Sequence, residues 1–223
     1  RNDSLMSTVQ HKQLWPGVEL TSVHTDKFKS GMMGVSLLVP LKRETAAANA
    51  LIPMILRRGT KNHPTMEKLN EALDELYGGV IEPVVRKEGE TQCVGFVASI
   101  LDDAYTLDGG SILEPAAKLM GEILQQPYTE QGTFCRSYLD SEKKNLIDQI
   151  RSVRNDKRQY SMRRLTEEMC ADEAFGINRL GDEAGVNEID GQTLWTQYQT
   201  LLSEARVELY YCGSAPVERV EQA

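Results

Sequence analysis

The chain has 223 residues, a net charge of −8, 40% hydrophobic residues and 26% charged residues. This composition is typical of a soluble globular protein with a substantial core, and it excludes both disorder and nucleic-acid binding driven by bulk positive charge. No apolar run approaches the roughly 20 residues of a membrane span, and the N-terminal RNDSLMSTVQ lacks the pattern of a signal peptide. We therefore expect a cytoplasmic protein with no membrane and no nucleic-acid partner.

Apolar periodicity divides the chain into strands and helices. In chain order the predicted elements are strands at 18–25 and 33–41, helices at 45–57 and 64–79, strands at 80–85 and 89–101, helices at 111–126, 130–158, 159–175 and 191–203, and a strand at 206–211. Thr65 is placed to cap the second helix, and Gly78 and Gly79 stop it. Strands followed by a block of helices indicate the α+β class: a largely antiparallel sheet of about five or six strands with helices packed on one face.

The first predicted helix contains a proline. From Thr45 to Arg57 apolar residues surround the helix on nearly every side, which predicts that it is buried. Pro53 has no N–H to donate to the carbonyl of Asn49, and its ring pushes against that carbonyl, at a cost of about 3 kcal/mol unless the helix bends. We therefore predict a buried helix that is bent near Pro53.

The residues after this helix resemble a known peptidase family. A basic-Gly-Thr turn (RRGT, 57–60) is followed by Lys-Asn-x-Pro (61–64), a helix with a Gly-Gly stop and a strand that runs into RKE (86–88). This series resembles the N-terminal domain of the insulinase and mitochondrial-processing-peptidase family, the M16-type inverted zinc peptidases. The resemblance covers nearly the whole chain. It implies that residues 1–223 form a single domain, the first half of a longer two-domain protein.

In that family the motif H-x-x-E-H places two zinc-binding histidines on one helix face, and the glutamate between them activates the zinc-bound water. Counted back without gaps from the Arg-Gly-Thr turn, these positions fall on Ala50, Pro53 and Met54. Alanine has no donor atom, proline cannot act as a base, and a thioether is too weak to hold zinc alone. Glu142 matches the family's downstream zinc glutamate, but one carboxylate does not make a site. The resemblance therefore implies a degenerate motif with no catalytic residue, no metal and no other cofactor.

The other candidate ligands are dispersed along the chain. His11, His24 and His63 are never four residues apart, and the four cysteines include no CxxC pair, so no relocated zinc site and no disulfide framework is predicted. Between Lys143 and Arg164 there are eight basic residues and two acidic residues. That excess suits either an acidic peptide or RNA partner or a solvated helix face, and we favour the solvated face.

The predicted strand at 80–85 carries a second departure from the family. There the family binds peptide substrates as an added strand, main chain to main chain. This chain has Glu82, Pro83 and Val84 in that segment. Pro83 removes a backbone donor and Glu82 adds a charge, and both changes discourage strand addition. Loss of peptide binding and simple protection against aggregation explain the changes equally well.

The resemblance implies a noncatalytic, peptidase-like bacterial protein that is a structural or substrate-shaping subunit. Its expected partner is a related, zinc-competent subunit, in a heterodimer that handles peptides. One alternative is a zinc-dependent peptidase with an unrecognised or partner-completed site. Another is an adaptor in bacterial translation-factor modification.

Overall fold

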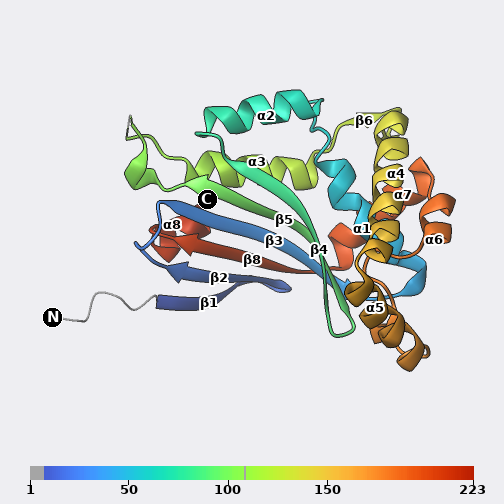
Figure 1. The fold of residues 1–223 in the computed structure, drawn as a ribbon. Coiled ribbons are helices and arrows are strands. Elements are labelled where there is room, and N and C mark those ends of the chain that lie inside the picture. Colours follow the sequence, from blue (N-terminus) through green and yellow to red (C-terminus); the bar gives the residue numbers. More distant parts are fainter. Residues whose placement is uncertain (1–7, 108) are drawn as a thin grey trace.

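The computed structural model describes residues 8–107 and 109–223, which form a six-stranded sheet with helices packed against one face (Figure 1). The strands, in order across the sheet, are β1 (Thr8–Trp15), β2 (Val18–His24), β8 (Arg206–Gly213), β3 (Ser30–Pro40), β5 (Thr91–Leu101) and β4 (Val80–Glu88). Strands β2 and β8 are parallel, and the other neighbouring pairs of this sheet are antiparallel. The predicted α+β class with a largely antiparallel sheet is confirmed.

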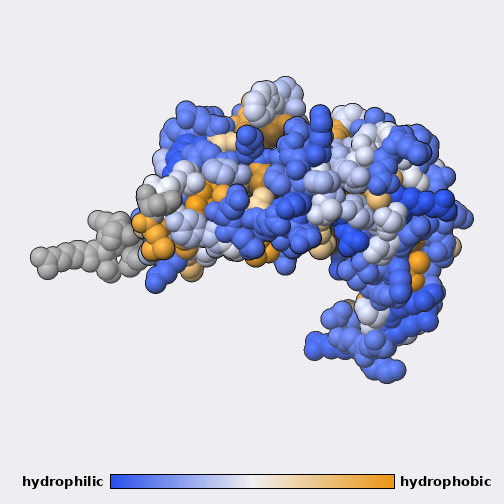
Figure 2. Space-filling view, turned by 90° about the horizontal axis from the view of Figure 1, so that it is seen from above, coloured by the Kyte–Doolittle hydropathy of each residue, from blue (hydrophilic) through white to orange (hydrophobic). Residues whose placement is uncertain are grey.

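The remaining elements are mostly helical. The α-helices are α1 (Arg43–Leu56), α2 (Met66–Glu75), α3 (Leu113–Gln125), α4 (Arg136–Ser152), α5 (Lys157–Met169), α6 (Glu183–Glu188), α7 (Gly191–Glu204) and α8 (Val217–Gln222). Short 3-10 turns lie at Asp103–Tyr105, Val153–Asn155 and Ala174–Gly176, and the strands β6 (Thr129–Glu130) and β7 (Thr133–Phe134) form a separate hairpin. No helix in the described ranges has both the length and the apolarity needed to cross a membrane. Figure 2 shows that the surface seen from above is mostly hydrophilic.

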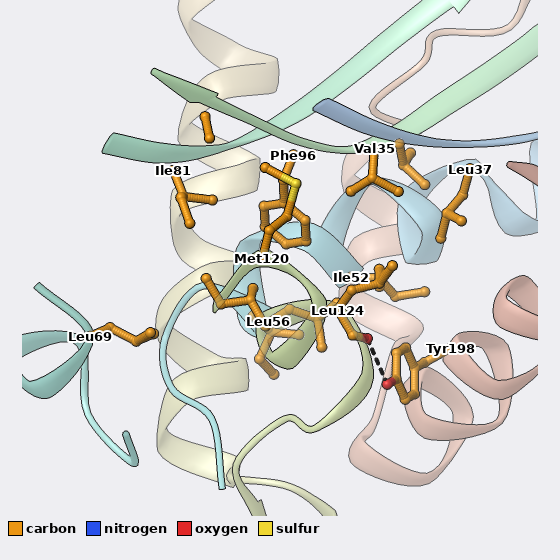
Figure 3. Close-up of a cluster of buried hydrophobic side chains, with 14 of the residues drawn as sticks. Val35, Leu37, Ile52, Leu56, Leu69, Ile81, Phe96, Met120, Leu124 and Tyr198 are labelled. Atoms are coloured by element: carbon orange, nitrogen blue, oxygen red, sulfur yellow. Dashed lines mark hydrogen bonds between the residues drawn. The ribbon is translucent and has the colours of Figure 1, made fainter. Parts of the chain in front are cut away.

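The hydrophobic core lies between the sheet and helices α1, α3 and α7 (Figure 3). Alternate residues of β3 and β5 point into it because strand side chains alternate between the two faces, and Val35, Leu37 and Phe96 are examples. The hydroxyl of Tyr198 on α7 donates to the carbonyl of Leu124 on α3 at 2.9 Å, and burial raises the pKa of Tyr198 to about 12. This hydrogen bond fixes α7 against the end of α3.

Helix α1 confirms the helix predicted across Pro53. It is continuous over Arg43–Leu56, and both Ala50 and Pro53 are buried. Pro53 lies in the last turn, where its carbonyl accepts a hydrogen bond from the N–H of Arg57 at 3.3 Å. The bend near Pro53 stays a prediction.

Two predicted helices are shorter than expected. The helix predicted at 130–158 begins only at Arg136, because Gln131 and Gly132, with φ values of 53° and 82°, turn the chain between β6 and β7. The helix predicted at 159–175 ends at Met169. Beyond it the chain makes a tight turn at Gly176, where an added Cβ would lie 2.1 Å from the carbonyl oxygen of Cys170.

Candidate functional site

The candidate site lies where the end of α1 approaches α4. Ala50 and Pro53 are buried and Met54 is half-buried, and all three belong to the side of α1 that packs into the protein. None of these side chains carries a nitrogen or an oxygen atom. Helix α1 therefore contributes packing at these positions and no group that could hold zinc or move a proton.

Glu142 on α4 is the buried carboxylate of this region, and it is held by neighbours of the chain itself. Its Oε1 lies 3.4 Å from Nη1 of Arg58, which follows α1, and its Oε2 accepts a hydrogen bond from Nδ2 of Asn145 at 3.2 Å. The side chain of Glu142 is only 9% exposed. A buried carboxylate is stable when a cation and hydrogen-bond donors compensate its charge, and Arg58 and Asn145 supply both.

The guanidinium of Arg58 is itself fixed by α4. Its carbon lies 5.1 Å from the centre of the Tyr138 ring, and Nη2 lies 3.5 Å from Oγ of Ser141. Tyr138, Ser141 and Glu142 thus present a ring face, a hydroxyl and a carboxylate to one arginine. The ion pair links the segment after α1 to α4.

These residues do not fit a zinc ion. The described ranges contain no group of three His, Cys, Asp or Glu side chains that could hold a metal. Glu142 is also paired with a cation, which would repel a metal ion brought beside it. The assignment of Ala50, Pro53, Met54 and Glu142 to the family's zinc-motif positions remains a prediction.

The three histidines lie apart from this site and from one another. His11 contacts Thr21 on β2, and His24 lies 3.9 Å from Asp26. His63 lies in the loop between α1 and α2, where its Nδ1 is 3.0 Å from Oε1 of Glu122. Each histidine has a local structural contact.

Glu122 on α3 organises the loop that contains His63, which the sequence did not indicate. Although burial raises its pKa, hydrogen bonds from Thr60, Asn62 and His63 leave the pKa of Glu122 below its usual range. The hydroxyl of Thr60 also accepts a hydrogen bond from the N–H of His63 at 2.9 Å. Thr60 is fully buried, so its hydrogen bonds with Glu122 and His63 hold the Arg-Gly-Thr turn in place, and its hydroxyl is not available as a nucleophile.

Several of the basic residues between 143 and 164 contact other groups of the protein. Nζ of Lys143 donates to the carbonyls of Asn187 and Ile189, at 3.0 and 2.6 Å. Arg151 pairs with Glu183 at 2.6 Å, and Arg164 pairs with glutamates one turn later. These contacts favour a solvated helix face over a nucleic-acid site.

The altered segment of β4 lies at the end of the strand order, beside β5. Glu82 and Pro83 are exposed and Val84 is half-buried. The structure therefore places all three at a sheet edge. Their role in discouraging peptide binding remains a prediction.

The sequence and the fold of this chain were compared with those of known proteins. No protein-family model matches the chain. The chain is 32% identical, over 207 residues, to the probable inactive metalloprotease YmfF of Bacillus subtilis (strain 168), an alignment that covers 93% of this chain and 49% of YmfF. A crystal structure of a conserved protein from Enterococcus faecalis V583 has 27% identity and a TM-score of 0.89, covering 97% of this chain and 51% of that protein.

A third similarity concerns the fold alone. The peptidase M16 inactive domain from Pseudomonas fluorescens superposes with a TM-score of 0.71 at 13% identity, covering 96% of this chain and 48% of the other. In its fold, the chain is an M16-like peptidase domain. The resemblance to this family is confirmed, and its named relative is a probable inactive metalloprotease. This M16-like domain spans about half the length of the relatives it matches.

Proposed function

We propose that this M16-like domain belongs to a noncatalytic subunit that acts together with a zinc-competent relative. The subunit either supports that relative structurally or shapes the path of its substrate. The observation that carries the proposal is the Arg58–Glu142 ion pair. An arginine neutralises the buried carboxylate of α4, while Ala50, Pro53 and Met54 of α1 offer no zinc-binding nitrogen or oxygen. The match to a protein named as an inactive metalloprotease supports the same conclusion.

The packing around α1 supports a retained structural role. Ala50, Leu51, Ile52 and Leu56 are each at most 1% exposed, so the helix that resembles the zinc helix still forms part of the core. A helix that keeps its packing without catalytic groups still contributes to the structure of the domain. In a peptidase assembly, such a domain can have a structural role when another subunit supplies the catalytic groups.

Helix α5 supports association with another protein. Each of its residues is at least partly exposed, and Met162, Leu165 and Met169 are exposed by 59%, 51% and 74%. Their spacing of three and four residues places them along one side of the helix. Exposed apolar stripes of this kind are commonly covered by a protein partner.

The test is to co-express the full-length protein with each zinc-competent family member from the same genome. We expect one candidate to co-elute as a complex of defined mass, and its peptidase rate or cleavage pattern to change when this protein is present. As a control, glutamine replaces the glutamate in the partner's own H-x-x-E-H motif. This change should abolish cleavage while the complex still forms.

Two outcomes would overturn the proposal. If no zinc-competent relative co-elutes and every candidate's rate and specificity stay unchanged, the partner role fails and the adaptor alternative gains support. If cleavage survives when the partner's motif glutamate is replaced, the chemistry does not lie in the partner.

A further inference from the structure

Strand β4 is the outermost strand on its side of the described sheet, with β5 as its neighbour (Figure 1). An outer strand presents backbone N–H and C=O groups to which another extended chain can pair. In an antiparallel pair the N–H and C=O of one residue point to the same side, and successive residues alternate. The groups that point away from β5 therefore decide whether this edge can accept a further strand.

Two arginine side chains donate hydrogen bonds to carbonyls of β4 that point away from β5. Nε of Arg57 donates to the carbonyl of Ile81 at 2.7 Å, and Nε of Arg179 donates to the carbonyl of Val85 at 3.0 Å. Pro83 lies midway between them and faces the same side, but it has no N–H. Each of these three residues has thus lost one of the two backbone groups that strand pairing uses.

Both arginines are anchored by groups outside β4. Nη2 of Arg57 donates to Oδ1 of Asn70 on α2 at 2.8 Å. The carbonyl of Arg179 accepts a hydrogen bond from Nε2 of Gln92, a fully buried side chain, at 2.6 Å. The guanidinium of Arg57 is therefore held from two sides, whereas Arg179 is held through its backbone carbonyl and through the contact of its Nε with Val85.

The chain around Arg179 also covers the far end of β4. Nζ of Lys87 donates to the carbonyl of Phe175 at 2.8 Å and to that of Ile177 at 3.4 Å. The same nitrogen lies 4.6 Å from the centre of the Phe175 ring. The segment 175–179 is thus fastened to β4 at two points, Val85 and Lys87.

We propose that Arg57 and Arg179 close the β4 edge, so that the domain does not bind an extended peptide by strand addition there. Glu82 and Pro83 alone leave outward carbonyls open along the strand, and the two arginines cover those of Ile81 and Val85. The closure rests on the contacts of this chain and stands or fails separately from the proposed subunit role.

The test uses a fluorescein-labelled peptide of about eight alternating threonine and valine residues, a length typical of a strand. Its binding is measured by fluorescence polarisation to the unaltered domain and to three variants. The first is Pro83→Val, which restores the missing backbone donor. The second combines Pro83→Val with Arg57→Met and Arg179→Met. The third adds Arg86→Met and Arg164→Met to Pro83→Val, which removes the same positive charge without touching the edge carbonyls.

We expect the variant lacking Arg57 and Arg179 to bind the peptide at least about tenfold more tightly than the other three proteins. The proposal is overturned if that variant is folded by circular dichroism yet binds no better than Pro83→Val. It is also overturned if Pro83→Val alone, or the charge-matched control, binds as tightly.

A measurement on the unaltered protein decides the matter if the key variant does not fold. In nuclear magnetic resonance spectra, the Nε–H protons of Arg57 and Arg179 should exchange with solvent at least about tenfold more slowly than that of the exposed Arg86. Equal exchange rates for the three arginines would show that Arg57 and Arg179 do not keep their hydrogen bonds to the β4 carbonyls. The edge would then be open.

Discussion

Replacing Arg58 by methionine is expected to lower the free energy of unfolding by about 3 kcal/mol, because it leaves the buried Glu142 carboxylate without its cation. We place the value at the low end of the range for broken buried ion pairs, since Arg58 keeps 24% of its side chain exposed. Asn145 alone cannot compensate the charge. Urea denaturation of the unaltered protein and of the Arg58→Met variant measures the difference.

A double-mutant cycle separates the ion pair from general packing. Glu142→Leu removes the carboxylate, and the double variant Arg58→Met/Glu142→Leu should be clearly more stable than the sum of the two single losses implies. Arg136→Met is the matched control, because Arg136 is 93% exposed and its contact with Asp140 is at the surface. Losses that simply add would show that Arg58 and Glu142 contribute to stability independently, and would contradict a stabilising ion pair between them.

Truncating Phe96 to alanine is expected to cost about 3–5 kcal/mol, the range for removing a large buried aromatic side chain. Phe96 is 1% exposed and lies on β5, with β3 on one side and β4 on the other. The variant loses buried apolar area and leaves a cavity beneath the helices (Figure 3). Thermal and urea unfolding monitored by circular dichroism give the change in stability.

Phe28→Ala provides the comparison for this prediction. Phe28 is 61% exposed, so the same truncation should change the unfolding free energy by less than about 0.5 kcal/mol. A similar loss at both positions would mean that the core does not lie under β5 as described.

Elements with strong local signals could be predicted from the sequence. Thr65 accepts a hydrogen bond from the N–H of Lys68, as expected of a helix cap, and Leu69 and Leu73 form the buried side of α2. Strand β1 was missed because its residues, TVQHKQLW, are almost all exposed and show no apolar alternation. The β6–β7 hairpin was missed because its strands have two residues each, too few for a period to appear.

The side-chain partners at the site depend on the tertiary fold and could not be predicted in this way. Glu142 and Met54 were singled out by resemblance, but Arg58 and Glu142 are 84 positions apart, and no spacing indicates that they meet. Pro83 was recognised as a break in the edge strand. Arg179, which donates to Val85 across 94 positions, has no comparable signal in the sequence.

The measurement that tests the central claim most directly is the zinc content of the purified protein, determined by mass spectrometry after dialysis from excess zinc. We predict less than about 0.1 zinc per chain, because Ala50, Pro53 and Met54 of α1 offer no zinc ligand and Glu142 is paired with Arg58. About one zinc per chain, lost when Glu142 is replaced by alanine and accompanied by chelator-sensitive cleavage of unfolded peptides, would contradict it.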